Sequence, residues 1–315
     1  MNKLIKSLNI ERVLFFDIEV VRSQDKLDIN SKEFELFQKK MRNRDTDELP
    51  TDEETIELYN RKAGLRMCFN KIVCISCGAV RDGQLYIKSY TGTEEEIIEA
   101  FHKKCLEFDY VGGYNVLYYD LPMIQINAMR YVGIEEIPER FSTSGKKPWN
   151  MDRIVELMDV VKGTHFTQPS LDEVCFHLNV PSSKEGGIDG SQVSDVYYKE
   201  GVDRVAAYCD RDVFATVNVF KKLRGEKMFD EYVDINTIQD QERVEDTPIL
   251  KAILNRGKIL AKEYKELEKV AKELDPGEIP NYKRIIQASL SKKEEDYGVK
   301  EITLFEKLDN LITNK

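Results

Sequence analysis

The sequence has no long hydrophobic run. None of its segments approaches the ~18 consecutive apolar residues that a membrane-spanning helix needs. The opening residues Met1, Asn2 and Lys3 are not followed by the apolar stretch of a secretory signal peptide. We therefore expect a soluble, cytoplasmic protein that has no membrane partner.

The sequence also has fewer basic than acidic residues. The 315 residues include 47 Lys and Arg against 57 Asp and Glu, so the net charge is −10. Proteins that coat duplex DNA by charge alone are usually strongly basic, so this class is disfavoured. An acidic nuclease is still compatible with the composition, because bound metal ions reverse the local field where phosphate must lie.

Cysteine and histidine are few, and their spacing indicates neither a zinc site nor a disulfide framework. Cys74 and Cys77 are three residues apart, but they lie in a strand-like run whose alternation points them to opposite faces. The three histidines, His102, His165 and His177, are scattered. We expect the cysteines to be core residues in a reducing compartment.

The remaining pattern predicts a mixed α/β fold followed by a helical extension. Apolar and alternating runs indicate strands, and runs with helical periodicity indicate helices. The expected strands are 12–21, 71–80, 84–90, 110–115 and 153–161, and the expected helices are 94–106, 120–131, 170–178 and 202–223. Three strands followed by alternating helices and strands form a mixed sheet flanked by helices. We place this domain at 1–225, with a charge-dense helical insertion at about 22–66, and a helical C-terminal extension at 226–315.

Two acidic residues interrupt the most apolar of these strands. Asp17 and Glu19 are two residues apart, so both carboxylates point to one face of the sheet. Two like charges inside a dry strand are costly unless a cation neutralises them, which suggests a metal site. The alternative is a strand that runs out into solvent, with its acids at the sheet edge.

Two further acids allow two interpretations each. Asp120 precedes Leu-Pro, where it either caps a helix or joins an acidic pocket. Tyr208 and Asp212 are four residues apart and share one face of a helix, whereas Asp210 points elsewhere. This pair is either an exposed acid beside a tyrosine at the edge of the core, or part of the same pocket.

Taken together, Asp17, Glu19, Asp120 and Asp212 can converge into one acidic pocket. Oxygen ligands of this kind suit Mg²⁺ or Mn²⁺ rather than zinc. Two such ions about 3.5–4 Å apart are the general device for in-line attack on a phosphodiester, in which one activates water and the other stabilises the leaving 3′ oxygen. We leave three further acids outside this ligand set: Asp152, Glu156 and Asp159.

These motifs and their order resemble those of the DEDD superfamily of 3′–5′ exonucleases. Residues 16–19 (Phe-Asp-Ile-Glu) resemble its first motif, Asn115 to Asp120 its second, and Tyr208 to Asp212 its third. The third motif has a tyrosine four residues before its aspartate, which marks the tyrosine subclass (DEDDy). The histidine subclass would have histidine at position 207, where this sequence has Ala207. The tyrosine subclass includes the proofreading exonuclease domains of family B DNA polymerases and their stand-alone relatives. The resemblance covers about residues 10–225 without the insertion at 22–66.

The resemblance implies an RNase H-like fold and a two-metal-ion enzyme. Such an enzyme would release nucleoside 5′-monophosphates from the 3′ end of single-stranded DNA. Asp17, Glu19 and Asp212 would hold the first Mg²⁺ or Mn²⁺ ion, and Asp120 would serve the second. Tyr208 would orient the attacking water through its hydroxyl, because an unperturbed phenol is a poor base at neutral pH.

The resemblance also suggests substrate contacts. Asn115 and Tyr119, in the second motif, would contact the terminal nucleotides or their phosphates. Ser170 and Leu171 resemble a Ser/Thr-Leu element that touches single strands, and a helix N-cap followed by a core leucine is the alternative. Lys184 resembles a lysine that contacts the scissile phosphate, although the loop has one glycine more than that pattern, and a solvated lysine is the alternative.

Two other functions stay open at this point. The same chemistry on RNA is one, because discrimination depends on contacts to the 2′-hydroxyl. An inactive nucleic-acid-binding or scaffold protein that keeps only the fold is the other. We expect the C-terminal helices to pack on the core, on a protein partner or on a second copy of the chain.

Overall fold

The computed structural model describes residues 3–134, 137–147, 150–182, 184 and 188–236. The chain divides into two compact units, Met1–Asp234 and Ile235–Lys315, and the fold below is that of the first. The predicted C-terminal helices lie outside the described residues, so they stay a prediction. No helix within the described ranges is both long and apolar enough to cross a membrane.

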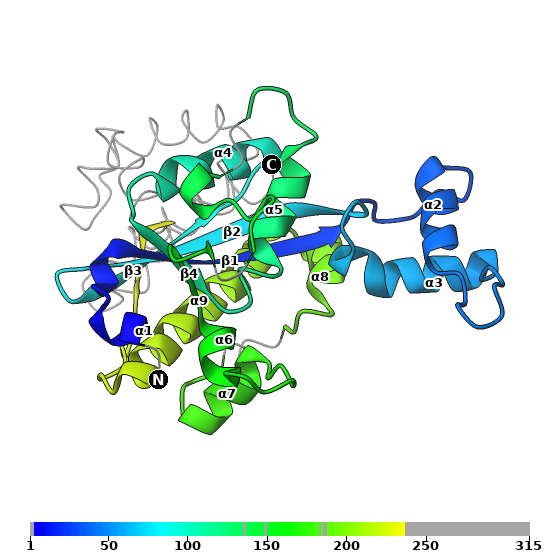
Figure 1. Ribbon diagram of the computed structural model, residues 1–315. Helices are drawn as coiled ribbons and strands as arrows, with labels where there is room; N and C mark the ends of the chain where they lie inside the picture. The colour runs from blue at the N-terminus through cyan, green and yellow to red at the C-terminus, as the bar shows by residue number, and fades with distance from the viewer. Residues whose placement is uncertain (1–2, 135–136, 148–149, 183, 185–187, 237–315) are drawn as a thin grey trace, which may run out of the picture. The chain divides into compact units, whose positions relative to one another are not determined.

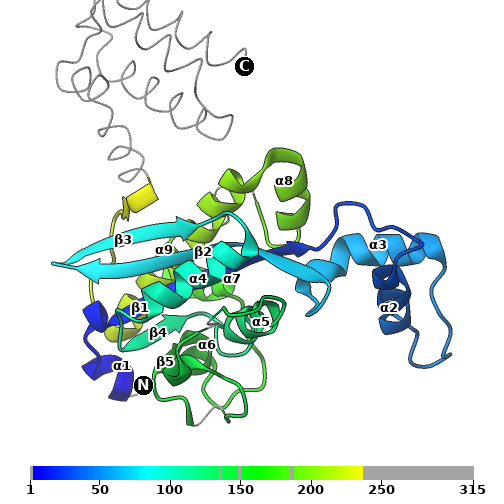
Figure 2. The ribbon, with the colours of Figure 1, turned by 90° about the horizontal axis from the view of Figure 1, so that it is seen from above.

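The centre of the fold is a six-stranded mixed sheet with the order β5-β4-β1-β2-β3-β6. Its strands are β1 Val13–Arg22, β2 Asn70–Arg81, β3 Gln84–Tyr90, β4 Tyr110–Gly113, β5 Ile154–Glu156 and β6 Val233–Asp234. β2 pairs antiparallel with both β1 and β3, whereas β1, β4 and β5 are parallel (Figure 2). The mixed sheet and its flanking helices confirm the predicted RNase H-like fold class.

Helices cover both faces of the sheet, which explains why β1 is almost continuously apolar. Leu14, Phe16 and Ile18 of β1 lie in a hydrophobic cluster with residues of α4 (Glu94–Cys105) and α5 (Asp120–Ala128). Side chains of β1 that point the other way pack towards α9 (Val202–Arg224), which contacts β1 and β2 (Figure 1). Alternation therefore places Asp17 and Glu19 on the α9 face.

The cysteines follow the same alternation. Cys77 lies in the cluster on the α4 side, and the Cys74 thiol contacts Cys209 of α9. The two thiols therefore point to opposite faces, as predicted. All six cysteines are free thiols, and five of them are buried; Cys68 is exposed.

The segment between β1 and β2 contains a pair of helices, α2 (Lys32–Lys40) and α3 (Asp52–Lys62), which extend away from the sheet (Figure 1). Ser31 caps α2, and Thr51 and Glu54 form a capping box that begins α3. This pair has a small core of its own, formed by Leu27, Phe34, Phe37, Tyr59 and Ala63.

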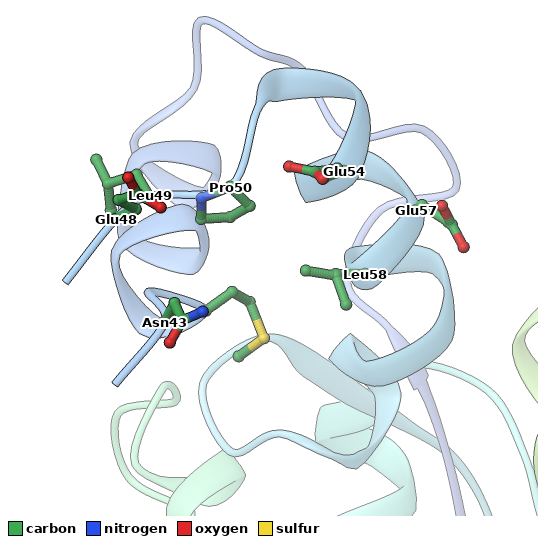
Figure 3. A pocket seen from close by; sticks show the side chains of 8 residues that line it. Asn43, Glu48, Leu49, Pro50, Glu54, Glu57 and Leu58 are labelled. Carbon is green, nitrogen blue, oxygen red and sulfur yellow. The ribbon is translucent and has the colours of Figure 1, made fainter. Parts of the chain in front are cut away.

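A hollow of about 380 Å³ opens between α3 and the segment 41–50 that joins α2 to α3 (Figure 3). Its lining mixes apolar side chains such as Leu49, Pro50 and Leu58 with carboxylates such as Glu54 and Glu57. None of the predicted site residues lines it. The hollow therefore belongs to the helical insertion and not to the predicted active site.

The prediction of a strand over 153–161 is wrong for most of its length. Only Ile154–Glu156 is a strand, and α6 (Leu157–Lys162) follows at once. The Glu156 carboxylate accepts a hydrogen bond from the Met158 N–H at 2.9 Å and so caps the new helix. The apolar run is buried in either conformation, so hydrophobicity could not distinguish them.

The other elements surround this framework. The predicted helix at 170–178 is α7, Leu171–Leu178, with Ser170 as its N-cap. Elements that the sequence pattern did not indicate are α1 Lys3–Ser7, η1 Ile10–Arg12, η2 Ala63–Leu65, η3 Glu139–Phe141, α8 Val193–Glu200 and β6.

Candidate active site

The first motif lies in the interior of the sheet and not at a solvent-exposed edge. β1 is flanked by β2 on one side and β4 on the other, and Asp17 and Glu19 lie opposite Ser76 and Cys74 of β2. Glu19 is only 8% exposed, and Asp17 is partly buried. The interpretation of these acids as a strand end in solvent is therefore wrong.

Asp120 joins the same place from the second motif. Its Oδ1 accepts a hydrogen bond from the backbone N–H of Ile18 at 3.1 Å, between the two acids of β1. Asp120 is the first residue of α5, and the N-cap position belongs to Tyr119, whose side chain makes no capping bond. The carboxylate of Asp120 thus faces β1, and the simple capping interpretation is wrong.

The turn between β4 and α5 depends on close packing against β1. A Cβ at Gly113 would lie 2.8 Å from the Phe16 carbonyl oxygen and 2.2 Å from a Val116 methyl carbon, so only glycine fits. Asn115 adopts a left-handed conformation with φ 69°, which asparagine tolerates better than most residues. These two residues allow the chain to return to β1 within a few residues of leaving β4.

The third motif presents one acid to the site and another away from it. Tyr208 is 6% exposed, and its hydroxyl hydrogen bonds to the Asp212 carboxylate one helical turn later. Asp210 accepts hydrogen bonds from the hydroxyls of Ser76 and Ser89 at 2.7 and 2.6 Å. The prediction that Asp210 points away from the Tyr208–Asp212 pair is confirmed.

The electrostatics indicate that the four predicted acids converge. The pKa of Asp17 is raised well above its usual value, first by burial and then by the negative charges of Asp212, Asp120 and Glu19. Burial and Asp212 likewise raise the pKa of Glu19. Burial raises the pKa of Asp120 to about 8, and Glu156 and Asp212 add to this rise. Such mutual repulsion requires the carboxylates to lie near one another.

The donor set fits hard divalent cations. Ligand atoms of Asp17, Glu19 and Cys209 lie within 4.8 Å of one another. The Cys209 thiol donates hydrogen bonds to Asp17, to its Oδ2 at 3.5 Å and to its carbonyl oxygen at 3.3 Å, and burial raises the thiol pKa well above its usual value. The carboxylate oxygens of Asp17 and Glu19 are hard ligands, which suit Mg²⁺ or Mn²⁺.

Glu156 was left outside the predicted ligand set, and the structure gives it a supporting position. Its carboxylate accepts the backbone N–H groups of Asn115 at 2.7 Å and Leu117 at 2.9 Å, as well as that of Met158. Burial raises its pKa to about 7 in spite of these three donors. The sequence feature that identified Asp17, an acid within an apolar run, would also have identified Glu156.

Tyr119 also lies at the acids. The carboxylates of Asp120, Glu19 and Asp17 raise the pKa of its phenol, after burial as the largest cause. Its buried hydroxyl has no hydrogen-bond partner among the described residues. A buried hydroxyl beside an acidic pocket is available to a bound substrate, which is consistent with the predicted contact of Tyr119 with the terminal nucleotide.

The other predicted substrate contacts have structural roles. Ser170 forms a capping box with Glu173 at the start of α7, and Leu171 packs against the hydrophobic cluster on the α9 face. Lys184 forms an ion pair with Asp172 at 3.1 Å and not with any of the four acids. The structure thus shows a helix cap at Ser170, a core contact at Leu171 and a surface ion pair at Lys184. Contacts of these residues with substrate stay predictions.

Comparisons with known proteins identify the class. Residues 63–272 match a family described as a predicted 3′–5′ exonuclease related to the exonuclease domain of PolB. The match covers more than half of the chain, and the chain belongs to this family. It contains Asp120, Tyr208 and Asp212, whereas the acids of β1 precede it and reach the site through the fold.

No curated protein matches the chain. Among solved structures it is similar to the family B DNA polymerase of the hyperthermophilic archaeon Pyrobaculum calidifontis, with 20% sequence identity and a TM-score of 0.43. This alignment covers 67% of the present chain and 24% of the polymerase chain. The present chain therefore corresponds to about a quarter of that polymerase.

Proposed function

We propose that this protein is a divalent-metal-dependent 3′–5′ exonuclease that hydrolyses single-stranded DNA from its 3′ end and releases nucleoside 5′-monophosphates. The observation that carries the proposal is the convergence of Asp17, Glu19, Asp120 and Asp212 from a strand and two helices. Membership of the exonuclease family supports the reaction class.

The acids supply the metal ligands in this proposal. Asp17, Glu19 and Asp212 hold one ion, and Asp120 serves a second. Bound Mg²⁺ or Mn²⁺ would activate water and stabilise the leaving 3′ oxygen. Without cations these carboxylates repel one another in a buried site, so metal binding relieves an electrostatic cost that the fold itself creates.

Tyr208 positions the attacking water in this proposal. Burial and the neighbouring acids raise the pKa of its phenol above the usual value of about 10, so the hydroxyl stays protonated at neutral pH. Its hydrogen bond to Asp212 fixes the orientation of that hydroxyl. Tyr208 therefore orients water by hydrogen bonding and does not act as the base.

The test uses 5′-labelled single-stranded DNA and RNA of matched sequence, with Mg²⁺, with Mn²⁺ and with chelator. We expect DNA fragments that shorten from the 3′ end, only with metal, and not with Asp17→Ala. Faster digestion of RNA would change the substrate but keep the chemistry. No cleavage of either strand by the folded protein would contradict the proposal and favour a binding or scaffold role.

A further inference from the structure

The loop between α6 and α7 carries an exposed aromatic pair. The rings of His165 and Phe166 are stacked, with centroids 4.7 Å apart and planes inclined by 18°. Phe166 is 88% exposed, so it contributes little to the core. An exposed phenylalanine by itself is common, but a stacked pair offers a flat apolar surface.

The geometry of this pair is fixed by its neighbours. Thr167 donates its backbone N–H to His165 Nδ1 at 3.2 Å, and its hydroxyl lies 2.6 Å from the same nitrogen. The His165 N–H donates to the Lys162 carbonyl at 3.0 Å, directly after α6. His165 is therefore held in place, and Phe166 stacks on a ring that is already oriented.

The loop that carries this pair is tied at both ends to the second motif. Before the loop, the Tyr118 hydroxyl donates to Asp159 Oδ2 of α6 at 2.7 Å. After the loop, the Tyr114 hydroxyl donates to the Pro169 carbonyl at 2.5 Å. Tyr114 and Tyr118 flank the predicted substrate contact Asn115, so the aromatic pair projects from a loop fastened to the predicted substrate-binding turn.

The strand order places the start of α6, the helix that precedes this loop, at the same edge of the sheet as the second-motif turn. β1, β4 and β5 are parallel, so their carboxyl ends meet at one edge. Phe15 pairs with Gly112, and Gly113 pairs with Glu156, so the second-motif turn and α6 leave the sheet beside the part of β1 that carries Asp17.

A cation lies beside this loop. Lys162 Nζ is 5.2 Å from the centre of the Tyr118 ring and 3.0 Å from Asp159 Oδ1. Tyr118 is 41% exposed, so an aromatic ring with an ammonium group beside it lies partly at the surface where α6 meets the second-motif turn. Grooves that bind single-stranded nucleic acid combine stacking aromatics with positive charge in this way.

We propose that His165 and Phe166 form a stacking platform for an unpaired base of the strand whose 3′ end enters the acidic site. This inference rests on the proposed function. The terminal nucleotide is assigned to Asn115 and Tyr119, so the platform takes a base on the 5′ side of the cleaved nucleotide. A base within a duplex cannot stack on the ring, so the platform favours single strands.

The test measures binding of a 5′-fluorescent oligothymidylate of about 12 nucleotides to the full chain in chelator, where the proposed cleavage does not proceed. Phe166→Ala should weaken binding about 5- to 100-fold, the range for loss of one stacked base. Phe166→Trp should restore binding, whereas Phe166→Leu, which is apolar but cannot stack, should not. The matched control is Phe176→Ala, which removes an equally exposed phenylalanine of α7 (86%) and should change nothing.

Kinetics with Mg²⁺ give a second readout. Phe166→Ala should raise KM for the oligonucleotide and leave kcat unchanged, and hydrolysis of a dinucleotide, which is too short to reach the platform, should be unaffected. Oligoribonucleotides tested in parallel show whether the platform also takes RNA. The thermal midpoint should not change, because Phe166 is exposed.

The possible failures are distinguishable. Suppose that the wild-type protein cleaves the oligonucleotide. If Phe166→Ala then binds it as well as the wild type does, or if Phe176→Ala weakens binding as much as Phe166→Ala does, the platform proposal is wrong and the exonuclease proposal stands. If the wild-type protein binds through Phe166 but never cleaves, the proposed function is wrong and the platform stands. If the wild-type protein does not bind the oligonucleotide, the platform is overturned.

Discussion

The molecule contains two kinds of buried acid, and they differ in what faces them. Asp210 accepts two serine hydroxyls, and Glu156 accepts three backbone N–H groups. Asp17 and Glu19 have other carboxylates among the main causes of their raised pKa values. The first kind is compensated by the protein itself, whereas the second kind calls for an external cation.

The groups that face a buried acid, either hydrogen-bond donors or other carboxylates, distinguish structural acids from site acids better than the exposed fraction does. Asp210 and Asp120 are 5% and 3% exposed, so burial alone would group them together. Asp120 accepts the backbone N–H groups of Ile18 and of Asp120 itself but lies among acids, whereas Asp210 accepts two serine hydroxyls. Each of the following predictions changes one acid and asks whether it behaves as its surroundings indicate.

The largest effect is expected for the site acids. Asp212→Asn should lower the cleavage rate by more than ~100-fold, because loss of a ligand exceeds the ~10–100-fold cost of losing a supporting contact. The matched control, Asp203→Asn, changes an exposed acid on the same helix and should leave the rate unchanged. Single-turnover cleavage measures both, and equal rates for Asp212→Asn and the wild type would place Asp212 outside the site.

Glu156→Gln should have an intermediate effect on the rate. The amide has one acceptor oxygen where three N–H groups converge, so the second-motif turn loses hydrogen bonds, and we expect a rate ~10–100-fold lower. The free energy of unfolding should fall by ~1–3 kcal/mol. Urea unfolding and cleavage rates measure the two effects, and Asp152→Asn, at an exposed acid nearby, is the control. A variant that loses stability but keeps full activity would make Glu156 purely structural.

Asp210→Ala should affect stability and spare catalysis. The hydroxyls of Ser76 and Ser89 lose their common acceptor, which should lower the free energy of unfolding by ~1–3 kcal/mol. Activity per folded molecule should stay within a few-fold of the wild type. A loss of activity as large as that of Asp212→Asn, in folded protein, would break the distinction between the two kinds of acid.

The last prediction concerns the pH dependence of stability without metal. A group whose pKa is higher in the folded state binds its proton more tightly there, so its stabilisation is full below the unfolded pKa and is lost as pH rises through the folded pKa. For Asp120 this loss extends from the unfolded value of ~3.9 to about 8. Urea midpoints should therefore fall between about pH 4 and about pH 8.

Mg²⁺ and Asp120→Asn provide the two controls for this pH dependence. Saturating Mg²⁺ should flatten the decline, because Mg²⁺ binds the ionised carboxylates of the folded state. Its stabilisation, ~2.7 kcal/mol at one hundred times its Kd, therefore grows as the acids lose their protons with rising pH. Asp120→Asn should remove part of the decline in chelator. A decline that is identical in this variant would show that Asp120 does not titrate as its surroundings indicate.

The sequence was sufficient where the chemical signal is local. Asp17 and Glu19 stand out because acids are costly in an apolar strand, and Tyr208 and Asp212 share a helical face by spacing alone. The hydrogen bond from Ile18 to Asp120 joins residues 102 positions apart, and no local pattern encodes such a contact. Only the motif resemblance linked them before the fold did.

The sequence was insufficient where one pattern serves two structures. The run from Ile154 to Met158 fits a strand or a helix equally well, and the Glu156 cap decided between them. Ser170 is both a good N-cap and a candidate substrate contact, and its capping box satisfies the first role without testing the second. Stacking of His165 on Phe166 depends on loop geometry, which composition does not determine.

The most direct test of the central claim is the stoichiometry of Mn²⁺ binding, measured by calorimetry on the full chain. If the four carboxylates form one metal centre, the wild-type protein should bind two ions and Asp17→Asn at most one. Asp210→Asn, at the structural acid, should bind as the wild type does. Equal Mn²⁺ binding by the wild type and Asp17→Asn would contradict the account.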